Sequence, residues 1–461
     1  MKYVSTRGAA PVLGFTDVLL TGLAADGGLY VPERWPALPG GLDPRAAYAV
    51  TATEVMRPFV EDSLPAEVLS RIVEDAYRGF DDPAVVPLRD LGGGFWLLEL
   101  FHGPTLAFKD LALQLVGRLF DHELRARGER VTIVGATSGD TGSAAIEACR
   151  DRESIEIFIL HPAGRVSDVQ RRQMTTVASR NVHNIAVEGT FDDCQDLVKA
   201  MFGDEAFRSE LRLSAVNSIN WARVMAQIVY YVTAGLSLGG GTSPVAFSVP
   251  TGNFGNIFAG YAAGLMGLPI SQLIVASNRN DILTRFFTTG TMEIRAVQPT
   301  ISPSMDIQVS SNLERLFFEM EGRNGAAVAE LMTEFRSQGT VSVPVEKLDG
   351  LRALFDCGRL DEDETRSVMA DVHRETGLLI DPHTAVGLGV ARRQRRDPSV
   401  PMVCLATAHP AKFPEAVEQA TGSRPEWPPW LADLNEAPER FVTMPRDLAA
   451  VEAHIRRCVG G

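Results

Sequence analysis

A single lysine lies in an apolar stretch of the sequence, LFHGPTLAFKDLALQ, which spans residues 100–114. Lys109 follows a Leu-Ala-Phe run, and another apolar run begins two residues after it. Lysine stems commonly pack along apolar surfaces while the ammonium group stays in water. An amine withdrawn from water instead has a lowered pKa and serves as a nucleophile or a base. The stretch by itself leaves both interpretations open.

A second stretch, VAFSVPTGNFGNIFAG at residues 245–260, has the composition of an anion-binding turn. It places small residues between an apolar strand and a helix, where backbone N–H groups approach a ligand closely and the helix adds its positive end. These residues are Gly252, Asn253, Phe254, Gly255 and Asn256. No lysine follows as in a nucleoside-triphosphate loop, and no GxGxxG is present. The alternative is an ordinary tight turn between a strand and a helix.

Two more turns have the same format of buried strand, small polar loop and helix start. The first, within VTIVGATSGDTGSAA, contains Ser138, Gly139, Asp140, Thr141 and Gly142 and is suited to a carboxylate or a second phosphate. The structural alternative is that Asp140 or Thr141 caps the following helix. The second is TAHPAKF, which begins at Thr407.

Short apolar strands that alternate with helices must position these turns. Strands are expected over residues 95–100, 131–134, 155–160, 184–187, 245–249, 273–276 and 402–406, and helices over 109–127, 192–201, 222–238 and 257–266. This alternation predicts βαβ units and a mostly parallel sheet, in which ligands bind at the carboxyl ends of the strands. The late strand 402–406 follows several helices, so we expect it to return to an earlier sheet and the domains to be discontinuous.

Composition narrows the class of protein. The 461 residues predict two or three domains, and a net charge of −14 argues against a nucleic-acid surface. Five scattered cysteines without a CxxC pair indicate free thiols, and no metal-ligand cluster is found. The sequence lacks a signal-peptide core and any run of about 18 apolar residues, so a cytoplasmic protein without a membrane span is expected.

Two anion-binding turns, a lysine in an apolar setting and no metal site together fit one cofactor. Pyridoxal 5′-phosphate carries its own phosphate and a carbonyl that condenses with a lysine.

Six ordered motifs carry a resemblance to a known family: HGPTLAFKD, GATSGDTG, HPAGRVSDVQRRQM, NSINWARVMAQIVYY, VPTGNFGN and TAHPAKF. The sequence resembles the threonine synthases, which belong to the β-family (fold type II) of pyridoxal-phosphate enzymes with tryptophan synthase β. The resemblance covers residues 2 to about 416. It implies an α/β fold with two mostly parallel open sheets, flanking helices and an N-terminal cap domain. The implied domains are residues 1–92 (N-terminal), 93–130 with 225–461 (large, cofactor-binding) and 131–224 (small, substrate-binding).

The resemblance also implies roles for single residues. Lys109 would form the Schiff base, residues 252–256 would hold the cofactor phosphate, and Thr407 would meet the pyridine nitrogen. The turn of residues 138–142 would take the substrate carboxylate, and Asn217, Ser218 and Arg223 would bind the substrate phosphate. Arg223 has a structural alternative, pairing with an acid on its helix. The role of His102 stays open.

The implied reaction converts O-phospho-L-homoserine and water to L-threonine and phosphate, by a monomer or a homodimer. A phospho-lyase that releases 2-oxobutyrate and ammonia, or a threonine or serine dehydratase, would use the same lysine. A cofactor-binding scaffold without turnover and a flavodoxin-like binding module are the alternatives outside these enzymes. The intact lysine disfavours the first, and the second leaves the lysine and the TAHPAKF turn unexplained.

Overall fold

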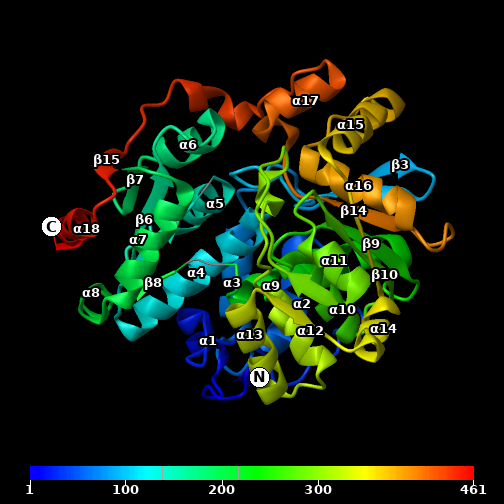
Figure 1. Cartoon of the computed structure of the whole chain (residues 1–461), viewed down its shortest axis with the longest axis horizontal. Coiled ribbons are helices and arrows are strands. Elements are labelled where there is room, and N and C mark those ends of the chain that lie inside the picture. The colour runs from blue at the N-terminus through cyan, green and yellow to red at the C-terminus, as the bar shows by residue number, and fades with distance from the viewer. Residues whose placement is uncertain (138, 216–217, 461) are drawn as a thin grey trace. The chain divides into compact units, whose positions relative to one another are not determined.

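The apolar stretches form two separate sheets. The computed structural model describes residues 1–137, 139–215 and 218–460. By its internal packing the chain divides into two units, residues 1–108 with 218–426 (unit 1) and residues 109–217 with 427–461 (unit 2). Each unit is therefore assembled from segments far apart in the sequence, as the late strand predicts. Figure 1 colours the chain from the N-terminus to the C-terminus.

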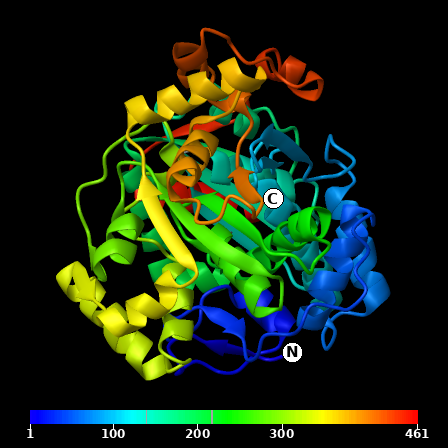
Figure 2. The same cartoon turned by 90° about the vertical axis from the view of Figure 1, so that its right-hand side faces the viewer.

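The sheet of unit 1 has six strands in the order β13-β10-β9-β14-β4-β3. The strands are β3 (Leu88–Gly92), β4 (Phe95–Glu99), β9 (Val245–Pro250), β10 (Ile270–Ser277), β13 (Phe355–Arg359) and β14 (Met402–Ala406). All pair in parallel except the edge strand β3, which is antiparallel to β4. Strand β14 lies between β9 and β4, so the predicted return of the late strand is confirmed. Figure 2 shows the yellow edge strand β13 beside the green strands.

Helices cover both faces of this sheet. On β9, Ala246 belongs to a core with helix α16 (Pro382–Gln394), whereas its neighbour Phe247 contacts the Tyr231 ring of helix α9 (Trp221–Gly239). Successive strand residues face opposite sides, so α16 and α9 cover opposite faces. The long apolar strands 245–250 and 402–406 are buried throughout, as a sheet covered on both faces requires.

The remaining elements of unit 1 surround this layer. They are β1 (Tyr3–Ser5), α1 (Phe15–Thr21), β2 (Tyr30–Pro32), α2 (Tyr48–Val60), α3 (Ala66–Tyr77), α10 (Gly255–Leu265), α11 (Ile282–Thr289), β11 (Thr291–Glu293), the 3₁₀ helix η1 (Pro303–Met305), α12 (Leu313–Met320), α13 (Gly325–Gln338), β12 (Thr340–Ser342), α14 (Val345–Arg352), α15 (Glu362–Thr376), η2 (Pro410–Lys412) and α17 (Pro414–Thr421). The N-terminal segment is tied to the rest of the unit by a buried ion pair, Arg7–Glu314, whose Nη2 and Oε2 atoms are 2.9 Å apart.

Unit 2 has a five-stranded, wholly parallel sheet in the order β15-β7-β6-β5-β8. Its elements are α4 (Lys109–Arg127), β5 (Val131–Ala136), α5 (Asp140–Cys149), β6 (Ile155–Pro162), α6 (Asp168–Thr175), β7 (Val182–Glu188), α7 (Phe191–Gly203), α8 (Glu205–Leu211), β8 (Leu213–Ser214), η3 (Pro429–Asn435), β15 (Val442–Pro445) and α18 (Leu448–Gly460). Helix α7 is capped by Thr190 and Asp193, which form a capping box.

The C-terminal tail completes this second sheet. Strand β15 pairs with β7, and Val451 and Ile455 of α18 are buried in the core beneath the sheet. Glu439 binds the guanidinium of Arg171, with its Oε2 atom 2.8 Å from Nε. Sequence reasoning assigned no role to the last 45 residues, and strands β3, β13 and β15 were not predicted. All three are edge strands, whose weaker apolar patterns leave little signal in the sequence.

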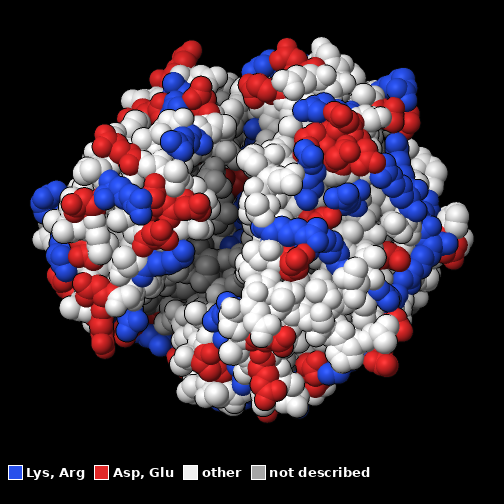
Figure 3. All heavy atoms as spheres, viewed as in Figure 1, with Lys and Arg blue, Asp and Glu red and all other residues white. Residues whose placement is uncertain are grey.

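Charged side chains of both signs lie on the surface (Figure 3). On the face shown in Figure 3, acidic and basic side chains are interspersed. All five cysteines are free thiols. Over the part of the chain that is described, helices long and apolar enough for a membrane crossing are absent.

Candidate active site

The turn between β9 and α10 in unit 1, residues 252–256, is the predicted anion-binding turn, and we call it the cradle. Helix α10 begins at Gly255, two residues earlier than the sequence predicts, so the glycine and asparagine that follow Phe254 belong to its first turn. N–H groups in the first turn of a helix lack intrahelical acceptors and face outward with the positive end of the helix. Phe254 has a left-handed φ of 63°, and its buried ring packs against Phe287 with 6.2 Å between centroids. Packing of this ring therefore fixes the turn in an otherwise unfavourable conformation.

A second segment, residues 310–312, fastens this turn from outside. Ser310 Oγ donates to the Gly252 carbonyl at 2.7 Å, and Ser311 Oγ donates to Asn253 Oδ1 at 2.9 Å. Asn312 donates from both its backbone N and its Nδ2 to the Asn253 carbonyl at 3.0 Å. Sequence reasoning missed these residues. Their Ser-Ser-Asn pattern before α12 resembles a helix cap, yet the Asn312 side chain makes no cap bond and serves the turn instead.

The two glycines of the cradle have no room for side chains. A methyl group added at Gly252 would lie 3.2 Å from both Met305 Cα and the Ser304 carbonyl oxygen. One added at Gly255 would lie 3.1 Å from Asn312 Nδ2. The glycines therefore allow the 302–312 segment to pack directly on the turn. A cradle of helix N–H groups with no side chain in the way fits a phosphate group.

The structure brings Ser218 beside this cradle. Its Oγ lies 3.4 Å from Ser311 Oγ, and its carbonyl accepts from Asn312 Nδ2 at 3.1 Å. Asn217 lies outside the described residues. Ser218 is thus close to the proposed cofactor-phosphate turn as well as to the start of α9.

Asn256, the last residue of the predicted turn, faces the core. Its Oδ1 accepts from the hydroxyls of Tyr230 and Tyr231 at 2.5 and 2.9 Å.

Arg223 is buried on α9, and burial lowers its pKa to about 10, which leaves it a cation near neutral pH. Asn220, which precedes the helix, caps it by accepting from Ala222 N at 3.0 Å and donates to the Leu19 carbonyl at 2.8 Å. Asn220 therefore has a structural task at the start of α9. Arg223 keeps the charge that a phosphate needs.

Thr407 lies in the loop after β14, against the segment that leads to Lys109. Its carbonyl accepts from Phe108 N at 2.9 Å, and Ala408 and Ala107 form an antiparallel bridge. The buried Lys412 Nζ donates to the Thr105 carbonyl at 2.7 Å. The TAHPAKF turn thus holds the backbone of residues 105–108, and Lys109 is the next residue along the chain.

His102 lies at the start of this segment. Its Nε2 is 2.9 Å from Glu99 Oε2, and Glu99 Oε1 accepts from Arg89 at 3.1 Å. Burial acts to raise the pKa of Glu99, but the bonds from His102 and Arg89 outweigh it and the pKa is lowered. His102 is therefore held by a carboxylate that stays ionised.

In unit 2, Lys109 is the first residue of α4 and its side chain is only 13% exposed. Its Nζ lies 3.5 Å from Asp140 Oδ2, and Asp140 Oδ1 accepts from Gln170 Nε2 at 2.9 Å. The sequence placed this amine in an apolar stretch. The structure adds a buried carboxylate beside it.

In the SGDTG turn, residues 138–142, some backbone N–H groups already donate to a side chain of the protein. Ser138 lies outside the described residues. Thr137 Oγ1 accepts from Gly139 N at 3.0 Å and from Gly142 N at 2.9 Å. The capping interpretation is wrong, because Gly139 is the N-cap of α5 and Asp140 is its first residue, with no side-chain cap bond. The Asp140 carboxylate is turned to Lys109 and Gln170 instead.

A lysine in a buried setting, a helix-start turn suited to a phosphate and parallel α/β sheets fit a pyridoxal-phosphate-dependent enzyme. Among the residues described, no group of potential metal ligands occurs. The family model described as "Pyridoxal-phosphate dependent enzyme" matches residues 83–334. Models described as "Threonine synthase N terminus" and "Threonine synthase, C-terminal" match residues 2–77 and 384–455. The chain belongs to the threonine synthase family.

Full-length relatives agree. A threonine synthase of Pseudomonas aeruginosa is 58% identical, with 99% of this chain and 98% of the relative covered. A crystal structure of threonine synthase from Brucella melitensis with bound pyridoxal phosphate superposes with a TM-score of 0.98 at 53% identity, covering 99% of both chains. The crystal structure of yeast threonine synthase superposes with a TM-score of 0.94 at 36% identity, covering 100% of this chain and 99% of that one.

Proposed function

We propose that this enzyme converts O-phospho-L-homoserine and water to L-threonine and inorganic phosphate. The observation that carries the proposal is the full-length similarity to threonine synthases, to which all three family models contribute. Three features of the chain suit this reaction: the cradle at Gly252–Asn256, the buried amine of Lys109 and the buried cation of Arg223.

The cofactor supplies the electron-withdrawing chemistry. When bound, pyridoxal phosphate offers a carbonyl that condenses with the Lys109 amine and a ring that withdraws electrons from the substrate α-carbon. Residues 252–256 would hold its phosphate, and Thr407 would meet its pyridine nitrogen with a neutral hydroxyl.

The residues of the chain bind the substrate and move its protons. Ser218 and Arg223, with Asn217, would bind the substrate phosphate, and the 138–142 turn would take the α-carboxylate. The Lys109 amine would remove the α-proton and later return one, which requires an unprotonated amine during the reaction. Asp140, 3.5 Å away, would hold the amine in place between these steps. Exclusion of bulk water would keep the intermediate from hydrolysing to 2-oxobutyrate.

The domains proposed from the resemblance are residues 1–92, 93–130 with 225–461, and 131–224. The packing units differ from them, because residues 109–130 and 427–461 belong to unit 2. We place the enzyme in the cytoplasm, a reducing compartment suited to five free thiols, as a monomer or homodimer.

The test is an assay of purified enzyme with O-phospho-L-homoserine that follows phosphate, L-threonine and 2-oxobutyrate together. We expect equal amounts of threonine and phosphate, lost in Lys109→Ala and kept in the control Lys199→Ala, whose side chain is 72% exposed. Phosphate with 2-oxobutyrate and ammonia would instead identify a phospho-lyase. Release of 2-oxobutyrate from L-threonine alone would identify a dehydratase.

A further inference from the structure

One segment of unit 1, residues 300–312, lies directly on the cofactor cradle, and we call it the strap. Its Ser304–Met305 backbone packs on Gly252, and its end donates to Gly252 and Asn253. Any displacement of the strap therefore changes the position of the first residues of the cradle. The question is what holds the strap itself.

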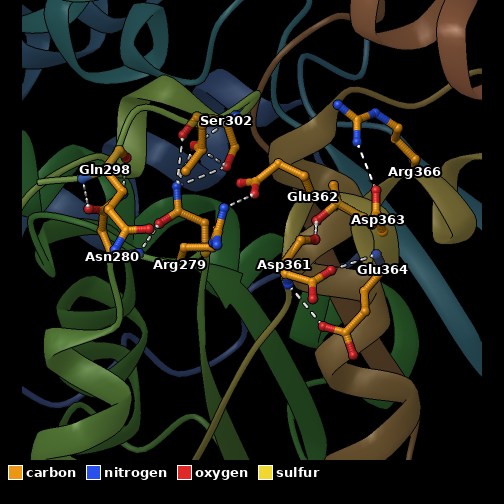
Figure 4. Close-up of polar contacts among 12 residues, drawn as sticks. Arg279, Asn280, Gln298, Ser302, Asp361, Glu362, Asp363, Glu364 and Arg366 are labelled. Atoms are coloured by element: carbon orange, nitrogen blue, oxygen red, sulfur yellow. Dashed lines mark hydrogen bonds and ion pairs between the residues drawn. The ribbon is translucent and has the colours of Figure 1, made fainter.

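The outer end of the strap is held by asparagines that follow β10. Figure 4 shows Asn280 facing Gln298, where Nδ2 donates to the Gln298 carbonyl at 2.8 Å and Oδ1 accepts from Gln298 N at 2.9 Å. Asn278 Nδ2 donates to Ser302 Oγ at 3.0 Å and to Asp306 Oδ1 at 2.8 Å. Between them, Arg279 reaches Glu362 at the start of α15 at 3.0 Å. These contacts fix the entry to the strap and reach Asp306, but none of them is made to Ser304 or Met305, whose backbone packs on Gly252.

The inner part of the strap is held by a histidine. His383, in the first turn of α16, is 3% exposed, and its Nε2 lies 3.1 Å from Ser304 N. Its Nδ1 lies 2.6 Å from Oδ2 of Asp381, which is fully buried and caps the same helix.

The two contacts determine the protonation state of the ring. A backbone N–H can only donate, so Nε2 must accept and carries no proton. The proton of the neutral ring therefore lies on Nδ1 and is donated to the Asp381 carboxylate, which in turn fixes the orientation of the ring. Asp381 and the Phe413 ring, 4.9 Å from His383 between centroids, hold the imidazole on its other sides.

We infer that His383, oriented by Asp381, is a positioning residue for the cofactor: it anchors the strap at Ser304 and so keeps the Gly252 end of the cradle in its phosphate-binding geometry. The inference rests on the proposal that the Gly252–Asn256 turn binds the cofactor phosphate. His383 touches neither substrate nor cofactor in this role. It acts through the main chain of the strap.

Two substitutions separate this role from simple packing. Asparagine places its amide near Nδ1, so His383→Asn keeps a donor for Asp381 and removes the hydrogen bond from Ser304 N to Nε2. Glutamine reaches farther, so His383→Gln presents a carbonyl oxygen to Ser304 N. Loss of one buried hydrogen bond costs about 1–1.5 kcal/mol, which corresponds to about tenfold in a dissociation constant.

The experiment titrates apo-enzyme with pyridoxal phosphate, followed by its absorbance near 400 nm, alongside thermal unfolding of the apo form. We expect His383→Asn to raise the Kd about tenfold and His383→Gln to stay within about threefold of wild type. The control His373→Asn, on α15, should keep the wild-type Kd. Equal Kd values for the Asn variant and wild type, or equal losses in Asn and Gln, would overturn the inference. Failure of the wild-type enzyme to bind the cofactor would instead contradict the proposed function.

A measurement without variants covers the case in which both substitutions prevent folding. Histidine-selective ¹⁵N NMR of the wild-type holoenzyme reports which ring nitrogen carries the proton. The inference requires a ring with protonated Nδ1 and unprotonated Nε2 that accepts a hydrogen bond. A proton on Nε2 of His383 would refute it.

Discussion

Replacing Gly252 with alanine tests whether the cradle depends on close backbone packing. The new methyl group would lie 3.2 Å from Met305 Cα and from the Ser304 carbonyl oxygen, and 3.4 Å from Ile307 Cγ1. Two of these contacts are shorter than ordinary van der Waals contact, and two of the three involve backbone, which cannot rotate away. The strap must then move by a few tenths of an ångström.

Overpacking of this kind costs about 1–3 kcal/mol. In the apo-enzyme the strap can shift outward and relieve part of it, but cofactor binding requires the turn in its original place. We therefore expect most of the penalty in the Kd for pyridoxal phosphate, which should rise roughly tenfold to hundredfold. The apo-enzyme should lose about 1 kcal/mol or less of stability.

The matched control is Gly350→Ala in the exposed middle of α14. A methyl group there would meet no atom within 4 Å, so the helix should gain about 0.5–1 kcal/mol and the Kd should not change. Titration with the cofactor and thermal unfolding measure both quantities. A Gly252→Ala enzyme whose Kd lies within about twofold of wild type would refute the steric reasoning.

Three further predictions concern stability. The bonds from Arg171 lower the pKa of Glu439 to about 2, so the contribution of this ion pair to stability is present above about pH 4.5 and is lost as the pH falls toward 2. In urea unfolding, Glu439→Gln should be about 1–2 kcal/mol less stable than wild type at pH 7 and equal to it at the acid end. A difference that stays constant with pH would contradict this. Ile455→Ala should destabilise unit 2 by about 2–5 kcal/mol, because it leaves a cavity under the sheet. The loss should appear as faster hydrogen exchange in β7. Unchanged exchange would show that α18 is dispensable. Burial, helped by the nearby His102, lowers the pKa of His409 to about 4, so the stability of the folded protein should fall as the pH drops from 6.5 through 4. His409→Asn should remove this part of the pH dependence. An identical pH profile of stability in the variant would rule out this role of His409.

Much of the architecture could be predicted from local sequence. The buried strands 245–250 and 402–406 are continuous apolar runs between turn residues, and the α7 cap at Thr190 follows directly from residue type. The boundaries of α5 and α10 were less predictable. Each helix begins inside its glycine turn, after an N-cap residue whose backbone conformation residue propensities do not indicate: Gly139 with a φ of 152° and Phe254 with a φ of 63°.

The sequence by itself determined the chemical parts of this enzyme: the lysine in its apolar stretch, the glycine turn after a buried strand, and the ordered motifs that resemble threonine synthases. These signals are local, because each depends on residues a few positions apart. The assignment of cofactor and substrate roles to individual residues stays a prediction.

Only the tertiary structure decided what surrounds those parts. It placed Asp140 beside Lys109, the 310–312 segment against the Gly252–Asn256 turn, and the C-terminal tail in the sheet of unit 2. The partners in these contacts are about 30 to more than 250 residues apart in the chain. The sequence around polar residues such as Ser310 and Gln170 does not indicate their distant hydrogen-bond partners. These partners depend on which strand ends the fold brings together.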